Sequence, residues 1–375
     1  MALDLTGVPF IDAHMHAPLR DRPQDVEGYR GRWYEGDPRD AALTADLTAY
    51  RWAIHELAQH LGCGDEEQAV IAATAERPGA AWLRETCARS QVEGVVVDTG
   101  YPPPERVLSP HEMRKVSGLR VAELARIEHA AVGLVAGSRS FSDFLKRFDE
   151  IIESAAEAGV AGIKSVVAYR SGLAIERVDY AAAEDAYVRE AARASGRLME
   201  KALLDFLVVR CLAAARRHSL PFQLHTGYGD REIDLRSANP LDLRPLLESD
   251  DARGVRIVLL HGAWPYTREA AWLAAVYPNV YLDVSTCIPP LGWAALVEMW
   301  KVTLAVAPIS RVHASSDAAG LAEQIGIGAA RARASLTVAL EELVRIGSLR
   351  AAEAEEVAEA VLGGTARQLY FGNDP

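Results

Sequence analysis

The chain has 375 residues, of which 50% are hydrophobic and 25% are charged, enough for a large buried core. Its formal net charge is −12 and no lysine- or arginine-rich run is present, which argues against nucleic acid as a partner. No apolar stretch reaches the length of about 18 residues that suggests a membrane span, and the N-terminus lacks the pattern of a secretory signal.

Short apolar runs alternate with longer helical patterns, which indicates repeated βα units and a parallel sheet. Eight runs have strand character: Phe10–His16, Gly94–Thr99, Leu124–Glu128, Gly162–Val167, Phe222–His225, Arg256–His261, Val280–Val284 and Val312–Ser316. Helical patterns fill most gaps: Ser142–Ala158, Ala182–Ser219, Leu241–Leu247, Arg268–Val276, Leu291–Ala307, Gly320–Ile346 and Ala351–Tyr370. The count predicts an α/β fold, a (β/α)8 TIM barrel formed by residues 1–375 as a single domain.

One connection is much longer than the others. Residues 17–93 separate the first two predicted strands and contain the helical patterns Ala42–Leu61 and Glu66–Ala75. A segment that follows a barrel strand leaves at the face that carries active sites. We therefore expect a helical cap insertion over the site, with a structural or oligomerisation insert as the alternative.

The first predicted strand contains two histidines, in the sequence Ile11-Asp12-Ala13-His14-Met15-His16. Side chains two residues apart on a strand share a face, so His14 and His16 project together. Two neighbouring imidazoles make half of a site for a divalent metal.

Three more polar residues end predicted strands. His225 and His261 each close an apolar run, and Asp317 directly follows the eighth predicted strand. Barrel enzymes hold their catalytic groups at these positions. Each residue also has an ordinary interpretation, as a hydrogen-bonded rim histidine or, for Asp317, as the N-cap of the next helix. Together with the first histidine pair, they favour one metal centre.

Lys164 lies in the fourth predicted strand, where a buried ammonium is costly unless it is paired or modified. A carbamylated Lys164 would bridge two metals. An unmodified Lys164 would order a carboxylate of the substrate or of the protein. A salt bridge with Glu128, assigned to the third strand, is the structural alternative.

This pattern resembles that of the amidohydrolase superfamily over nearly the whole chain. The ending Gly364–Tyr370 is similar to that of the decarboxylase-like branch. The stretches GIKSVVAYRSGL, FQLHTGYGD, VLLHGAWPYTREAAWLAAVYPNVYLDVS and SSDA resemble, more narrowly, the amidohydrolase-type domain that precedes a glutamine synthetase-like domain in some fungal and plant proteins. The chain ends after the barrel, so we expect no synthetase-like domain.

By position, the resemblance implies that His14, His16, His225 and Asp317 bind one divalent metal. Zinc is the commonest metal with such ligands, and manganese and iron also accept them. His261 would bind a second metal or act on the substrate. Lys164 matches the carbamylated lysine of two-metal members in strand position, but the decarboxylase-like ending favours one metal. We expect a single metal and an unmodified Lys164.

These roles describe hydrolysis of an amide, a lactam or a lactone, of which we prefer the amide. Asp317 would be the general base, His261 would lie next to the developing oxyanion, and Lys164 would be an anchor. The metal would lower the pKa of bound water towards 7. The glutamine synthetase-like association suggests a γ-glutamyl-type amide. Non-oxidative decarboxylation of a small carboxylic acid is the alternative reaction, and a pseudo-enzyme acting as a partner module is a third possibility.

Five residues are candidates for binding a carboxylate on the substrate. Arg126 and Glu128 would share one face of the third strand, Tyr169 and Arg170 follow the fourth strand, and Arg236 lies in the loop after the fifth. Arginine binds carboxylates through paired hydrogen bonds. A surface ion pair is the alternative for each arginine.

The cysteines Cys63, Cys87, Cys211 and Cys287 are scattered without CxxC spacing. We expect them to be reduced in a cytoplasmic protein. The expected partner is a small-molecule substrate, with neither nucleic acid nor membrane. Barrels of this kind often pair, which would give a homodimer.

Overall fold

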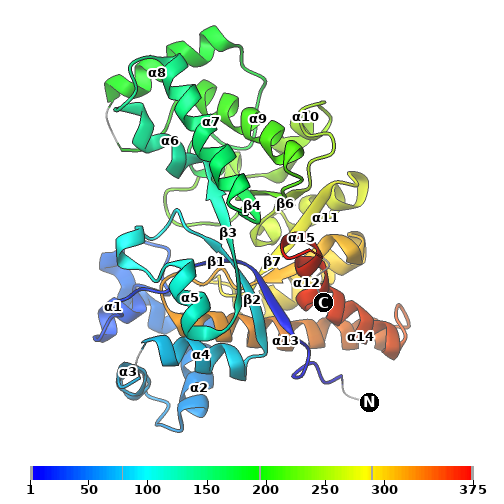
Figure 1. The fold of residues 1–375 in the computed structure, drawn as a ribbon. Coiled ribbons are helices and arrows are strands. Elements are labelled where there is room, and N and C mark those ends of the chain that lie inside the picture. Colours follow the sequence, from blue (N-terminus) through cyan, green and yellow to red (C-terminus); the bar gives the residue numbers. More distant parts are fainter. Residues whose placement is uncertain (1–2, 78, 194–195, 289, 373–375) are drawn as a thin grey trace. The chain divides into compact units, whose positions relative to one another are not determined.

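A computed structural model describes residues 3–77, 79–193, 196–288 and 290–372 (Figure 1). In these residues eight strands form one sheet in the order β1 to β8, and the β1–β2 pair and the pairs from β3 to β7 are parallel. The strands are β1 (Phe10–His16), β2 (Val92–Asp98), β3 (Arg120–Arg126), β4 (Gly162–Ser165), β5 (Phe222–Leu224), β6 (Ile257–Leu259), β7 (Val280–Ser285) and β8 (Val312–Ser315).

Helices separate successive strands. After β2 the helices are α5 (Pro110–Ser117), α6 (Ile127–Val135), α7 (Phe141–Glu157), α8 (Tyr180–Arg193), α9 (Lys201–Arg217), α10 (Arg244–Leu247), α11 (Thr267–Val276), α12 (Trp293–Val306), α13 (Ala322–Arg345), α14 (Ala351–Glu359) and α15 (Thr365–Tyr370). This alternation and the sequential strand order are those of a (β/α)8 TIM barrel, as the sequence predicted.

Two predicted helices are divided in the structure. The pattern over Ala182–Ser219 forms α8 and α9, and Gly196 between them has a left-handed φ of +70°, which favours glycine. The pattern over Ala351–Tyr370 forms α14 and α15, which are joined by a π-helical turn at Ala360–Gly364.

The chain divides into two compact units. The terminal unit comprises Met1–Ala122 and Asp283–Pro375, and the central unit comprises Glu123–Leu282. The terminal unit contains β1, β2 and β8, while the central unit contains β4, β5 and β6. Each unit therefore positions its own candidate residues.

β1 lies in the core of the terminal unit, and all seven of its residues are buried. Its start is fixed by Arg333 of α13, whose guanidinium donates to the carbonyl of Val8 and lies 5.9 Å from the Phe10 ring. Burying a strand that contains Asp12, His14 and His16 costs solvation free energy, which must be recovered by contacts at those side chains.

The segment 17–93 consists mainly of helices until β2 begins at Val92. Its described elements are α1 (Val26–Arg30), a 3-10 helix (Pro38–Asp46), α2 (Thr48–Leu61), α3 (Glu67–Ala75) and α4 (Gly79–Arg89). The segment begins beside the connections that follow β2 and β8, because Leu108 N donates to Pro18 O and Leu19 N donates to Gly320 O. Its role as a cap stays a prediction.

No helix in the described part of the chain combines the length and the apolar character that a membrane crossing requires.

Candidate metal centre

Both histidines of β1 face one carboxylate in the terminal unit. The Nε2 atoms of His14 and His16 lie 3.5 Å and 3.8 Å from Oδ1 of Asp317. Ligand atoms of a tetrahedral zinc ion with bonds of about 2.0–2.2 Å lie about 3.3–3.6 Å apart. The donor atoms therefore fit a divalent metal with only a small contraction.

The carbonyl of Tyr101 orients the imidazole of His16. His16 Nδ1 lies 3.1 Å from Tyr101 O, and a carbonyl oxygen can only accept a hydrogen bond. The proton is therefore on Nδ1, and the lone pair is on Nε2, which faces Asp317. A hydrogen bond to the second ring nitrogen is the usual way in which proteins orient a metal-binding histidine.

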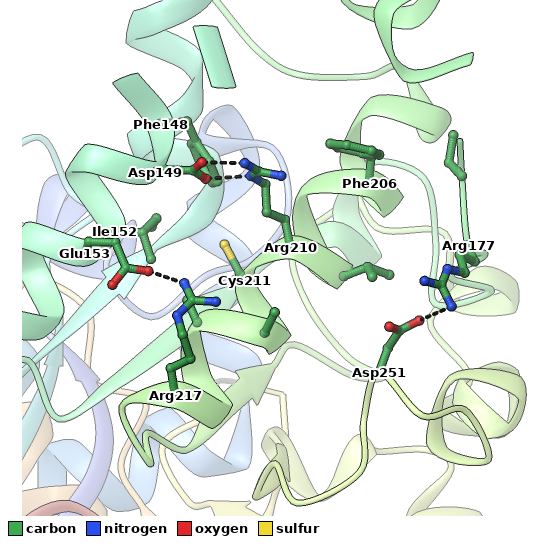
Figure 2. A pocket seen from close by; sticks show the side chains of 14 residues that line it. Phe148, Asp149, Ile152, Glu153, Arg177, Phe206, Arg210, Cys211, Arg217 and Asp251 are labelled. Atoms are coloured by element: carbon green, nitrogen blue, oxygen red, sulfur yellow. Dashed lines mark hydrogen bonds and ion pairs between the residues drawn. The ribbon is translucent and has the colours of Figure 1, made fainter. Parts of the chain in front are cut away.

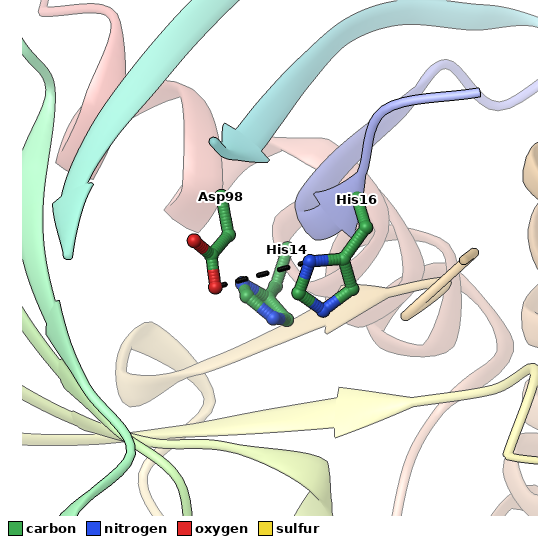
Figure 3. A group of neighbouring side chains, drawn as sticks. All are labelled: His14, His16 and Asp98. Carbon is green, nitrogen blue, oxygen red and sulfur yellow. Dashed lines mark ion pairs between the residues drawn. The ribbon is translucent and has the colours of Figure 1, made fainter. Parts of the chain in front are cut away.

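Asp98, the last residue of β2, is not among the site residues predicted from the sequence. It is fully buried, and its Oδ2 lies 3.8 Å from His16 Nδ1 (Figure 3). His14, His16 and Asp98 each offer a ligand atom within 4.8 Å of the others. Asp98 approaches the nitrogen of His16 that faces Tyr101. Its carboxylate could therefore orient this ring or serve as a second carboxylate ligand of a metal. It ends an apolar run, the same signal that identified His225 and His261.

Asp317 follows β8 by two residues, and its side chain is 26% exposed, so solvent and substrate can reach it. Its backbone has a φ of +57°, a left-handed conformation that non-glycine residues seldom adopt. Beneath it, the buried carboxylate of Asp12 accepts hydrogen bonds from Ser316, and burial raises the pKa of Asp12 to about 7.

In the central unit His225 and His261 contact each other. His261 Nε2 lies 2.9 Å from His225 Nδ1, and the Tyr169 ring lies 4.6 Å from the His225 ring, centroid to centroid. His225 directly follows β5, whereas His261 begins a turn beyond β6 and has a φ of +65°. Positive φ values at both His261 and Asp317 are typical of functional sites, where local backbone strain concentrates.

Lys164 lies in β4 of the central unit, where it is only 1% exposed, and it is in register with Arg126 of β3 and Gln223 of β5. Glu128 does not share a strand face with Arg126, so that expectation is wrong. β3 ends at Arg126, and Glu128 lies in the first turn of α6.

Glu128 holds the end of β4. Its Oε1 accepts hydrogen bonds from Ser165 Oγ at 2.7 Å and from Val166 N at 2.9 Å. Burial raises the pKa of this carboxyl, which the hydrogen bond from Ser165 partly offsets. Its contacts are those of a residue that fixes the backbone beside Lys164.

The remaining candidates for substrate binding differ in exposure. Arg170 is 20% exposed and its guanidinium lies 3.6 Å from Glu232, whereas Arg236 is 90% exposed and pairs with Asp234. Arg236 therefore forms a surface ion pair, which is the alternative interpretation given above for each arginine.

A pocket of about 480 Å³ lies elsewhere, between α7 and α9 of the central unit (Figure 2). Its six charged lining residues pair with one another as Arg210–Asp149, Arg217–Glu153 and Arg177–Asp251. None of the site residues predicted from the sequence lines it. The pocket therefore shares no lining residue with the candidate metal centre.

Comparison with known proteins supports the family resemblance. Protein fluG of Emericella nidulans is 30% identical over 278 residues, which cover 69% of this chain and 32% of that protein. This chain therefore spans about a third of the length of that relative.

Solved structures share the fold. A protein from Lactobacillus casei that is assigned as a metal-dependent hydrolase has a TM-score of 0.88 and 26% identity, over 99% of this chain and 98% of the other. A uronate isomerase from Thermotoga maritima has a TM-score of 0.70 and 16% identity, over 98% and 95%, which is a likeness of fold alone. Residues 11–372 match the family model described as amidohydrolase. The chain belongs to the amidohydrolase family.

Proposed function

We propose that this protein is a metal-dependent hydrolase that cleaves the amide C–N bond of a small, carboxylate-bearing substrate, such as a γ-glutamyl-type amide. The observation that carries the proposal is the approach of the two Nε2 atoms of His14 and His16 to one oxygen of Asp317. The likeness to the assigned hydrolase of Lactobacillus casei supports the same class of reaction.

One divalent metal, zinc by preference, would be held by His14, His16 and Asp317. When bound, it would polarise the substrate carbonyl and lower the pKa of bound water. The assignment of His225 as the fourth ligand rests on the sequence pattern. A tautomer in which His225 Nδ1 donates to His261 Nε2 would place the lone pair of His225 on Nε2, where it suits a ligand.

Asp317 would also act as the base. Its Oδ1 faces the two imidazoles, and its partial exposure lets the carboxylate exchange a proton with water and then with the leaving amine. His261 would donate to the developing oxyanion, and Lys164, Tyr169 and Arg170 would orient the substrate carboxylate.

A metal analysis combined with a substrate screen tests this function. We expect about one divalent metal per chain, release of amine from a γ-glutamyl amide, loss of turnover with a chelator, and recovery with zinc, manganese or iron. Full turnover by chelated, metal-free protein would overturn the proposal. Release of carbon dioxide from a carboxylic acid without amine release would replace hydrolysis with decarboxylation.

A further inference from the structure

The turn that presents Asp317 is closed by side-chain hydrogen bonds. Ser316 Oγ accepts a hydrogen bond from Ala318 N at 2.9 Å, so it bridges the two sides of Asp317. A serine hydroxyl that binds the backbone two residues later stabilises a tight turn. This contact helps to hold Asp317 at its φ of +57°.

Asp12 fixes the hydroxyl that closes this turn. Its Oδ1 accepts from Ser316 N at 2.8 Å, and its Oδ2 accepts from Ser316 Oγ at 2.5 Å. Because the hydroxyl proton is directed to Asp12, an oxygen lone pair of Ser316 is directed towards Ala318 N. Both contacts lie in a buried interior, where a carboxylate interacts strongly with donors.

The backbone on either side of Asp317 is also tied to β1. Asp317 N donates to His14 O at 3.0 Å, and His16 N donates to Ala318 O at 2.7 Å. Gly328 of α13 packs closely against this turn, since a Cβ built at Gly328 would lie 2.5 Å from the Cβ of Ser316. The turn is therefore tied to β1 on both sides of Asp317, and Asp12 determines the direction of its central hydrogen bonds.

We propose that Asp12 is a positioning residue, which acts through Ser316 to hold the carboxylate of Asp317 opposite the Nε2 atoms of His14 and His16. This inference rests on the proposed function, because it assumes that Asp317 binds the metal. It assigns no chemical step to Asp12, which touches Ser316 and not the reacting atoms.

The variants Asp12→Asn and Ser316→Ala test the positioning role. An asparagine presents an amide N–H where one carboxylate oxygen accepted, so one Ser316 donor loses its acceptor. Ser315→Ala is the matched control: Ser315 is equally buried and donates to the buried Asp283 at 2.9 Å, but its hydroxyl does not bind the Asp317 turn.

The readouts are zinc affinity, measured by competition with a chelator, the free energy of unfolding of the metal-free protein, and kcat and KM. We expect Asp12→Asn and Ser316→Ala each to weaken zinc binding by about 10- to 100-fold, the usual effect of losing an outer-shell partner. kcat should fall while KM changes little. The double variant should be no worse than either single variant, because both break one chain of contacts.

Ser315→Ala should lose stability to a similar extent and keep zinc affinity. Equal zinc affinities in Ser316→Ala and Ser315→Ala would overturn the inference, as would wild-type affinity in Asp12→Asn. Ser316→Ala, which removes a single oxygen atom, decides the question if Asp12→Asn fails to fold. The zinc affinity of Asp317→Asn separates the two proposals. If this affinity is unchanged, the proposed metal site is wrong. If it is weakened while Asp12→Asn binds zinc as tightly as the wild-type protein, only the positioning role is rejected.

Discussion

At the scale of single residues, Asp317 carries the most specific prediction. Asp317→Asn keeps the shape of the side chain and the turn but removes the charge and the proton acceptor. We expect kcat to fall by at least about 10²-fold, the usual contribution of a general base, with an unchanged circular dichroism spectrum. Near-normal turnover would assign the base to another residue, with His261 as the first candidate.

Lys164 distinguishes a one-metal site from a two-metal site. A carbamate forms from the neutral amine and carbon dioxide, so a carbamylated site needs bicarbonate when metal is added back to the metal-free protein. We expect reconstitution that does not depend on bicarbonate, and a metal content near one per chain. A bicarbonate requirement with a content near two would show that Lys164 is carbamylated.

The candidate site could be predicted in part because strand ends are visible in the sequence. His14 and His16 follow from the alternation of a strand, and Asp317 follows from its position at the end of the eighth predicted strand. Asp12 could not be recognised, because its role depends on Ser316, a contact across 304 residues. For Arg236 the sequence left two interpretations open, and its pairing with Asp234, two residues away on the surface, could be recognised only in the structure.

At the scale of elements, apolar runs located every strand, but the ends of the strands were less clear. In the sequence, Glu128 continues the alternation of polar and apolar residues of β3. In the structure, β3 ends at Arg126 and α6 begins at Ile127. Hydrophobic periodicity describes which residues are buried, and it does not separate a strand end from the first turn of a helix that is also buried.

One ion pair ties the insertion to the helix that follows Asp317. Glu323 in the first turn of α13 is 1% exposed and accepts from Arg22 Nη2 at 2.6 Å and from Trp82 Nε1 at 2.9 Å. Glu323→Gln would leave Arg22 without its counter-charge in a largely buried place. We expect a loss of about 2–4 kcal/mol in the free energy of unfolding, measured in urea.

Asp46→Asn is the control for that measurement, since Asp46 pairs with Arg51 on the surface, where both side chains are mostly exposed. A surface pair contributes about 0–1 kcal/mol. Similar losses in Glu323→Gln and Asp46→Asn would show that the insertion is not anchored through Glu323.

At the scale of the whole molecule, the cysteines report on the two units separately. Cys87 and Cys287 are buried in the terminal unit, and Cys211 is buried in the central unit. Burial raises the pKa of all three thiols, that of Cys287 to about 12, so their reactive thiolates are scarce at neutral pH. We expect Cys63, which is partly exposed, to react with a maleimide in the native protein, and the others to react only as their unit unfolds.

The metal should protect the terminal unit in this experiment, because His14, His16 and Asp317 all belong to it. A metal at about 100 times its Kd stabilises the state that binds it by about 2.7 kcal/mol. The free energy of unfolding falls by about 1–3 kcal/mol per molar urea. The urea concentration at which half of Cys87 and Cys287 is labelled should therefore rise by about 1–3 M. Peptide mass spectrometry after a labelling pulse measures each cysteine. The Asp317→Asn variant should show a much smaller shift. An equal shift in that variant, or the absence of any shift in the wild-type protein, would contradict a metal held by these three residues.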